Sequence, residues 1–256
     1  IISNKSCGNT YRHNTFVACS GTLTLRHGNR CAVHGNWFFG NGQKGTGGIR
    51  LIGEDHRVYN NYLANLEGDD TRSAISFQLG LPDSPPSGYF QVKGTIVAFN
   101  TIIDCKSPLA IGVGDEDAGD PARLLPPIDC VIANNLIACR EGRPPVARMD
   151  ARSQIRFAGN LVAGAPEPAP LPEGMRETVA PTESSPEGMR RHAAATPAHA
   201  TATADAPFVH DDIDGQPRGT IRDIGCDQHS DAPVTRRPLS PKDVGPRWLQ
   251  PPAGGA

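Results

Sequence analysis

The fold of this chain is decided by residues 22–61, which contain the runs Thr22-Leu23-Thr24-Leu25-Arg26-His27-Gly28-Asn29, Gly35-Asn36-Trp37-Phe38, Gly47-Gly48-Ile49-Arg50-Leu51-Ile52-Gly53 and Asn60-Asn61-Tyr62-Leu63. An asparagine before an apolar pair returns once in each block of turn and strand. This recurrence is typical of a solenoid, in which every repeat covers the apolar face of its neighbour.

The asparagine period extends over most of the chain. The repeated positions are Asn14, Asn36, Asn61, Asn100, Asn135 and Asn160, separated by 22, 25, 39, 35 and 25 residues. The two long gaps predict one inserted loop each, at residues 79–91 and 114–127. Both segments are rich in proline and glycine, the residues that favour turns.

The runs between the asparagines have the character of strands. They alternate or are β-branched, as in Ile49-Arg50-Leu51 and Ile96-Val97-Ala98-Phe99. Asparagines stacked at one corner can pair with one another, which avoids the cost of about 1–3 kcal/mol for a buried unsatisfied amide. We therefore predict an all-β fold, a right-handed parallel β-helix over residues 1–163. A β-sandwich with asparagines in its turns is the alternative, but turns alone would not keep the shared register.

Two further segments follow the predicted coils. Residues 164–206 are rich in Pro, Ala and Glu and contain few large apolar side chains, so we expect a flexible insertion. In residues 207–256, the runs Asp211-Asp212-Ile213-Asp214-Gly215 and Asp223-Ile224-Gly225-Cys226-Asp227 predict a closing turn at the end of the solenoid, followed by a tail. At the other end, the chain starts inside a strand-like run without methionine, and we expect an N-terminally truncated β-helix.

The net charge and the absence of long apolar runs argue against a nucleic acid or a membrane as the partner. The net charge is −2, so no global basic field attracts nucleic acid or a membrane surface. No apolar run reaches the 18 residues typical of a membrane span. We expect a secreted or periplasmic protein whose signal peptide is not in this sequence. The seven cysteines show no zinc-ligand spacing, and stacked cysteines in such a fold serve mainly as small core residues.

Cations gather on neighbouring coils. Lys5, Arg26-His27 and Arg50 fall at similar places in successive repeats, and stacked strands lie about 4.8 Å apart. Long cationic side chains on one outer face would line a groove that suits a linear polyanion. The alternative is an ordinary solvated strand face.

The same blocks resemble a known family. Ile2-Ser3-Asn4-Lys5-Ser6, Leu23-Thr24-Leu25-Arg26-His27-Gly28-Asn29, Gly40-Asn41-Gly42 and the run from Gly47 to Gly53 are similar to polysaccharide lyase family six, which includes alginate lyases and chondroitinase B-like enzymes. Arg26 follows Lys5 by 21 residues, the spacing of the catalytic pair in that family. The resemblance covers roughly residues 1–160 and 208–249, so the chain resembles the C-terminal part of the catalytic β-helix.

The resemblance implies β-elimination at a uronic acid. Lys5 would remove the C5 proton, acting in the neutral amine form that burial and neighbouring cations favour. Arg26 would stabilise charge on the leaving oxygen. His27 is a candidate for substrate contact, with a hydrogen-bonded wall residue as the alternative. Arg50 would bind the carboxylate of a neighbouring sugar.

Calcium is the cofactor that the resemblance implies for the full-length protein. In the family, calcium neutralises the substrate carboxylate, and its acidic ligands lie just before the catalytic lysine. Only four residues precede Lys5, and Glu54-Asp55 lies two coils away as an expected coil corner. We therefore expect no calcium bound by this fragment, with the ligands upstream of Ile1, and a fragment that is inactive or nearly so.

The substrate remains open among anionic polysaccharides. The run Leu81-Pro82-Asp83-Ser84-Pro85-Pro86 and the following Tyr89-Phe90-Gln91-Val92 are more similar to the alginate-acting members than to the dermatan-acting ones. The alternatives are a dermatan or chondroitin lyase, a β-helix that only binds polysaccharide, and a pectin-type hydrolase. A hydrolase needs two carboxylates across the scissile bond, and the face carrying Lys5 offers none in this stretch.

Overall fold

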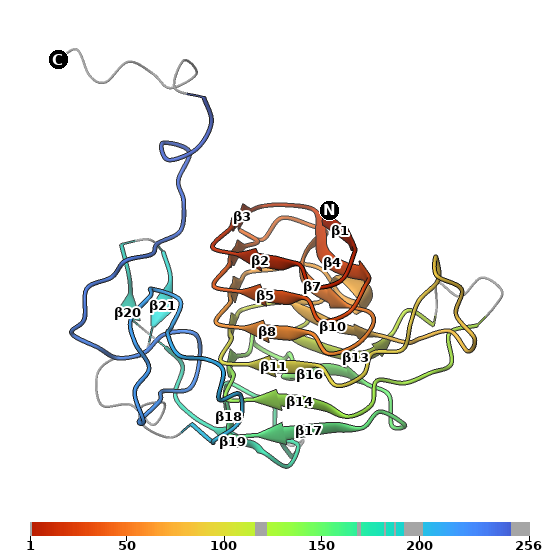
Figure 1. Cartoon of the computed structure of the whole chain (residues 1–256). Helices are drawn as coiled ribbons and strands as arrows, with labels where there is room; N and C mark the ends of the chain where they lie inside the picture. Colours follow the sequence, from red (N-terminus) through yellow and green to blue (C-terminus); the bar gives the residue numbers. More distant parts are fainter. Residues whose placement is uncertain are drawn as a thin grey trace.

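The computed structural model describes residues 2–115, 122–167, 170–181, 183–186, 188–191 and 202–246. Over these residues the chain winds into stacked coils, each built from three short strands, and equivalent strands pair in parallel down the stack (Figure 1). The predicted right-handed parallel β-helix is confirmed. Helical structure in the described ranges is limited to one 3-10 turn, η1 (Asp70–Arg72). No helix among these residues is long and apolar enough to cross a membrane.

Three parallel sheets make the walls of the β-helix. Sheet A contains β1 (Ile2–Lys5), β4 (Gly21–His27), β7 (Thr46–Leu51), β10 (Ile75–Gln78), β13 (Leu109–Val113) and β16 (Val146–Met149). Sheet B contains β2 (Thr10–Arg12), β5 (Ala32–His34), β8 (Arg57–Tyr59), β11 (Ile96–Ala98), β14 (Cys130–Ala133) and β17 (Ile155–Ala158). Sheet C contains β3 (Thr15–Val17), β6 (Trp37–Phe39), β9 (Tyr62–Ala64), β12 (Thr101–Ile103), β15 (Leu136–Ala138), β18 (Asn160–Ala163) and β19 (Met175–Glu177).

The repeated asparagines stack at the corner between sheets B and C. The Nδ2 atom of each donates to the Oδ1 atom of the next at 2.9 Å, in the order Asn14, Asn36, Asn61, Asn100, Asn135 and Asn160. The second amide hydrogen goes to a backbone carbonyl, such as that of Ala98 for Asn100. The predicted ladder is confirmed, and it satisfies the buried amides as the sequence requires.

The interior is filled by stacked apolar side chains. In sheet A the column of Leu25, Leu51, Phe77 and Ile111 is fully buried and in register from coil to coil. Three cysteines, Cys31, Cys105 and Cys130, belong to the same buried core. The described cysteines are all free thiols; Cys7 and Cys19 are exposed, and the buried ones act as small core residues.

The inserted segments emerge together from one edge of the stack, as the two long gaps predicted (Figure 1). The first joins β10 to β11 and the second joins β13 to β14. Two backbone hydrogen bonds join the segments: the amide of Gly80 donates to the carbonyl of Leu125 at 2.8 Å, and the amide of Leu125 donates to the carbonyl of Gly80 at 2.9 Å. The side chain of Gln91 adds a bond of 2.7 Å to the carbonyl of Pro126. The described parts of both segments are therefore joined to each other beyond the end of β10.

Residues 164–206 are better anchored than their composition suggests. In the described part of this segment, β19 extends sheet C, and a short antiparallel pair forms between β20 (Glu183–Ser184) and β21 (Arg190–Arg191). Met189 is buried at 1% exposure and accepts a hydrogen bond from the Trp37 indole at 3.2 Å. The expectation that this segment lacks apolar anchors is therefore wrong for these residues. Residues 192–201 lie outside the described residues.

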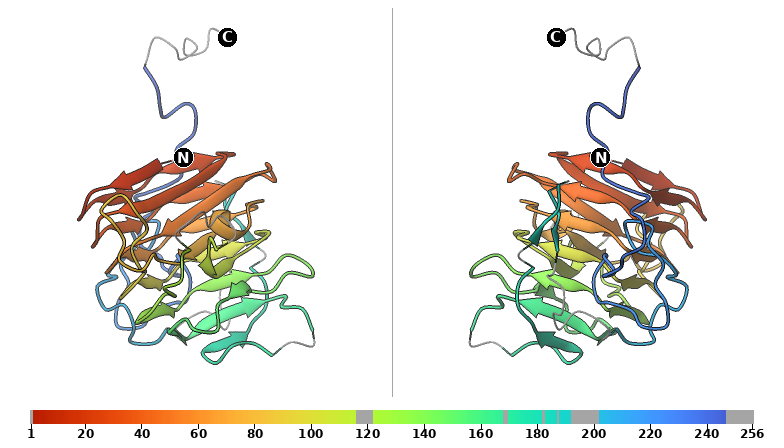
Figure 2. Two further views of the ribbon diagram at one scale, coloured as in Figure 1. Left: turned by 90° about the vertical axis from the view of Figure 1, so that its right-hand side faces the viewer. Right: turned by 90° about the vertical axis from the view of Figure 1, so that its left-hand side faces the viewer.

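The C-terminal segment differs from the expected closing turn. Residues 202–246 run along the side of the stack rather than across its end (Figures 1 and 2). They bond to several coils: the backbone of Leu239 to Thr15, Cys226 to Thr101, and Thr203 to Asn134. The fully buried guanidinium of Arg218 donates to Asn60 and to the carbonyl of Gly225. Acidic turn motifs alone do not reveal which surface of a solenoid they will cover.

Candidate active site

The predicted catalytic pair lies at the C-terminal ends of the first two strands of sheet A. Lys5 ends β1 and pairs with His27 of β4, after an irregularity in register between Asn4 and Lys5. Arg26 immediately precedes His27, and the Lys5 side chain is exposed. The structure therefore brings Lys5, Arg26 and His27 to one edge of the sheet, as the spacing predicted.

Arg50 is placed two residues earlier along the sheet. It pairs in register with Thr24 rather than with Arg26, although 24 residues separate the two arginines. Its long side chain reaches toward the same region, where its guanidinium carbon lies 5.7 Å from the centre of the Tyr89 ring. Arg26 and Arg50 therefore do not occupy equivalent strand positions. Their guanidinium groups lie near the same ring because the arginine side chain is long.

Tyr89 is the centre of this arrangement. It belongs to the first inserted segment, and its hydroxyl accepts a hydrogen bond of 2.5 Å from Arg26 Nη1. The guanidinium carbon of Arg26 lies 4.4 Å from the ring centre, within the range of a cation–π contact. His27 fixes the same segment, because its Nε2 lies 3.1 Å from the carbonyl of Gly88. That contact requires the proton of His27 to be on Nε2.

Gln78 holds Arg50 from the end of β10. Its Oε1 accepts hydrogen bonds from Nε and Nη2 of Arg50, at 2.8 and 2.5 Å. Gln78 is fully buried, so the position of the acceptor is set by packing. An amide oxygen that accepts two hydrogen bonds fixes the orientation of the guanidinium.

Arg123, from the second inserted segment, completes what we call the cationic cluster: Lys5, Arg26, His27, Arg50 and Arg123. The guanidinium carbon of Arg123 lies 4.1 Å from the centre of the Tyr89 ring, and its Nη1 donates to the carbonyl of Gly114 at 2.5 Å. Sequence analysis did not identify Tyr89, Gln78 or Arg123 as site residues. Only Tyr89 carried a signal, through its place in a loop of family-like sequence.

The residues around Lys5 do not fit a calcium site. Asn4 is nearly buried, and its Oδ1 already accepts from Asn9 Nδ2 at 2.5 Å and from the Tyr11 hydroxyl at 3.0 Å. Calcium needs six to eight oxygen ligands, several of them carboxylates. Within the described ranges, the one group of acidic side chains close enough to share an ion is Asp212, Asp214 and Asp227, and it is built from the C-terminal segment.

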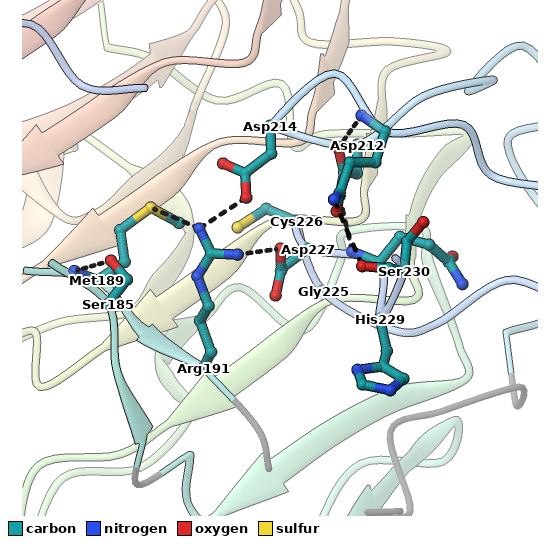
Figure 3. A network of polar contacts seen from close by, with 12 residues as sticks. Ser185, Met189, Arg191, Asp212, Asp214, Gly225, Cys226, Asp227, His229 and Ser230 are labelled. Carbon is teal, nitrogen blue, oxygen red and sulfur yellow. Dashed lines mark hydrogen bonds and ion pairs between the residues drawn. The ribbon is translucent and has the colours of Figure 1, made fainter. Parts of the chain in front are cut away.

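That acidic group is occupied by protein donors (Figure 3). Arg191 contacts Asp214 Oδ2 at 2.6 Å and Asp227 Oδ1 at 2.9 Å. Backbone amides of Gln216 and Gln228 donate to the two oxygens of Asp212. The pKa of Asp227 is raised to about 7, chiefly by burial, with Asp214 and Asp212 also raising it and Arg191 and Arg218 lowering it. This group ties β21 to the C-terminal segment.

Comparison with known proteins places these features in a family context. The family model described as Chondroitinase B matches residues 1–184. No curated protein sequence matches the chain. Among solved structures, a mutant of the PL6 family alginate lyase AlyGC is 28% identical, with a TM-score of 0.76, over 98% of this chain and 30% of that one. Another AlyGC structure is 31% identical, with a TM-score of 0.69, over 88% of this chain and 28% of that one.

A third structure comes from the human gut microbiota. It is described as a mannuronic acid specific polysaccharide family 6 lyase, and it is 26% identical with a TM-score of 0.57. The match covers 69% of this chain and 40% of that one. The chain thus spans less than a third of the length of the AlyGC structures and less than half of the third.

Proposed function

This chain belongs to the chondroitinase B family, polysaccharide lyase family six, and we propose that it carries the catalytic face with which its protein cleaves a uronic-acid polymer by β-elimination. The observation that carries the proposal is the meeting of Lys5, Arg26 and His27 at one edge of sheet A, beside Arg50 and beneath an inserted segment. Such a concentration of cations on an open strand face suits a polymer with repeating carboxylates.

In the proposed reaction, Lys5 acts as the base. Its neutral amine takes the proton from C5 of the uronate, and the electron pair of that bond forms the C4–C5 double bond. The bond from C4 to the glycosidic oxygen breaks, and that oxygen leaves with the electron pair and takes a proton from water, while Lys5 returns its proton to solvent. The products are a shortened polymer and a chain whose new end is an unsaturated uronate.

Arg26 stabilises negative charge on the departing oxygen in this scheme. Its guanidinium stays protonated, and the Tyr89 hydroxyl orients it without cancelling its charge. A donor fixed before the reaction costs no reorganisation when charge develops. Arg50 binds the carboxylate of an adjacent sugar, supported by the two hydrogen bonds that hold it on Gln78.

We favour alginate as the substrate. The support is the likeness to solved alginate lyases over most of this chain and the loop sequence around Tyr89. Dermatan sulfate is the alternative, supported by the family description itself. For the whole protein we retain calcium and a secreted or periplasmic location as proposals. The described residues around Lys5 provide no calcium site, and no step above uses one.

The test measures ultraviolet absorbance from the unsaturated uronate on alginate and, separately, on dermatan sulfate. In the whole protein, Lys5→Ala should abolish the signal while polymer binding persists, because a base acts only in the transition state. Arg26→Ala should lower turnover strongly, and Arg50→Ala should mainly raise KM. Lys44→Ala removes an exposed lysine from a turn outside the cluster and should act like wild type.

Three results would contradict parts of this assignment. Wild-type rates for Lys5→Ala would exclude Lys5 as the base. Cleavage that yields no unsaturated product would indicate a hydrolase. Binding of the polymer with no cleavage by the whole protein would favour a β-helix that only binds polysaccharide.

A further inference from the structure

The second inserted segment carries an arginine whose role the catalytic scheme does not explain. Arg123 lies over the same aromatic ring as Arg26, at 4.1 Å from the Tyr89 ring centre against 4.4 Å for Arg26. Two guanidinium groups on one ring repel each other. A bound anion near the two groups would reduce this repulsion.

Among the residues that the structure describes, the contacts of Arg123 are with uncharged groups. Among the described residues, its hydrogen bond reaches the uncharged carbonyl of Gly114 and its planar face reaches Tyr89. Arginines elsewhere on the coils pair with carboxylates: Arg140 binds Glu67 through two nitrogens, and Arg152 binds Asp150. Within the described part of the inserted segment, the guanidinium of Arg123 is oriented by a carbonyl and an aromatic ring and contacts no carboxylate.

The backbone that directly follows Arg123 is held by hydrogen bonds. Leu124 and Leu125 donate to the carbonyl of Gly80, each at 2.9 Å, which ties the residues after Arg123 to the end of β10. On the other side, Gly114 has a φ of +86°, and a Cβ atom there would collide with the amide nitrogen of Gln78. Such close packing demands glycine, and it fixes the carbonyl that orients Arg123.

Gln78 supplies an independent sign of a ligand site. Its side chain is fully buried, and its Nε2 has no hydrogen-bond partner among the described residues. The same side chain uses its oxygen for Arg50. A buried, unsatisfied amide beside Gly114 and Arg123 is costly, and it adds a donor to a region already rich in positive charge.

We propose that Arg123 is a substrate-binding residue that takes the carboxylate of a uronate next to the sugar held at Arg26. This inference rests on the proposed function, because it assigns a second sugar of the same polymer. In the strand order of sheet A, Arg50 on β7 and Arg123, which is held at Gly114 after β13, lie on the same side of the catalytic pair, so the polymer extends from Arg26 in that direction. The planar face of Arg123 on Tyr89 leaves its nitrogen edge to donate two parallel hydrogen bonds.

The experiment compares Arg123→Gln, Arg123→Lys and the control Arg176→Gln in the whole protein. Arg176 is an exposed arginine of β19 on sheet C, so the control makes the same change of charge away from the cluster. Dissociation constants are measured in a Lys5→Ala background, with oligomannuronates, oligoguluronates and dermatan sulfate oligosaccharides of increasing length. KM and kcat are measured without that change.

We expect Arg123→Gln to weaken binding about tenfold or more, the usual effect of losing a charge-assisted contact, and to raise KM with kcat nearly unchanged. Arg123→Lys should lie between, since it keeps the charge but not the planar fork. The effect should vanish for oligosaccharides too short to reach Arg123. Unchanged binding at every length, or an equal loss in Arg176→Gln, would overturn the proposal.

The experiment distinguishes a failure of the β-elimination hypothesis from a failure of the binding role assigned to Arg123. If the whole protein yields no unsaturated product, β-elimination is excluded, but the dissociation constants still decide whether Arg123 binds the polymer. If elimination occurs and Arg123→Gln binds normally, the proposed function stands and the assignment of Arg123 is wrong. Thermal unfolding of each variant shows whether a loss of binding reflects a loss of folded protein.

Discussion

Arg26 and Tyr89 lie 63 residues apart in the sequence, yet Nη1 of Arg26 donates a 2.5 Å hydrogen bond to the Tyr89 hydroxyl. The ring also lies 4.4 Å from the guanidinium carbon. One side chain of an inserted segment therefore orients the arginine that we assign to the departing oxygen.

Removing the hydroxyl tests this relationship. Tyr89→Phe keeps the ring but deletes the acceptor of Arg26, so we expect turnover to fall about tenfold, with a smaller change in KM. Tyr89→Leu removes the ring as well and should have a larger effect. Tyr59→Phe, on sheet B, is the matched control. Equal rates for Tyr89→Phe and wild type would show that the hydroxyl does not position Arg26.

The asparagine ladder should contribute unequally along its length. Asn100 is fully buried and bonds to neighbours on both sides, so Asn100→Ala leaves buried groups unsatisfied. We expect a loss of about 2–4 kcal/mol in the free energy of unfolding, measured by denaturant titration. Asn14 is exposed at one end of the ladder, and Asn14→Ala should cost under about 1 kcal/mol. Similar losses for the two variants would contradict a cooperative ladder.

The segment at residues 164–206 was predicted to be flexible, and limited proteolysis should still cut there first. Met189 is the anchor to test, since it is buried against Trp37. Met189→Ala should speed cleavage by about 30-fold or more, because losing a buried methionine costs about 2–5 kcal/mol locally and about 1.4 kcal/mol is tenfold. Met149→Ala, at a methionine that is 46% exposed, should leave the rate unchanged. Equal rates for both variants would show that Met189 does not restrain the segment.

Asp227 should make stability depend on pH. Burial raises its pKa to about 7, well above the roughly 3.9 of an unfolded aspartate. Between these values the folded state holds a proton that the unfolded state releases, so the free energy of unfolding should fall as the pH rises from about 4 to about 7. Denaturant titrations at pH 5 and pH 8 measure this change.

Asp227→Asn isolates the contribution of that carboxyl. The variant should lose part of the pH dependence, by more than about 1 kcal/mol, since one pKa unit corresponds to about 1.4 kcal/mol. Asp231→Asn, at an exposed position nearby in the sequence, should keep the full dependence. If Asp227→Asn and wild type lose stability in parallel between the two pH values, Asp227 is not the titrating group.

The positions of Lys5 and His27 could be predicted because the two residues are separated by about one coil of the β-helix. Lys5 and His27 are neighbours in register, so a spacing of about one coil was enough to bring them together. Arg50 shows the limit of this reasoning. It is 24 residues from Arg26, but residues of β4 pair here with residues of β7 that lie 26 positions later, so Arg50 pairs with Thr24.

The sequence by itself determined the β-helix, its asparagine corner and the cationic edge of sheet A. These features repeat locally, and each coil imposes its register on the next through backbone and amide hydrogen bonds. Only the tertiary structure decided that Tyr89, Gln78 and Arg123 join that edge, and that Met189 and the C-terminal segment pack along the side. These contacts join segments without a shared period, and their meeting depends on the conformation of the loops and on the shape of the finished stack.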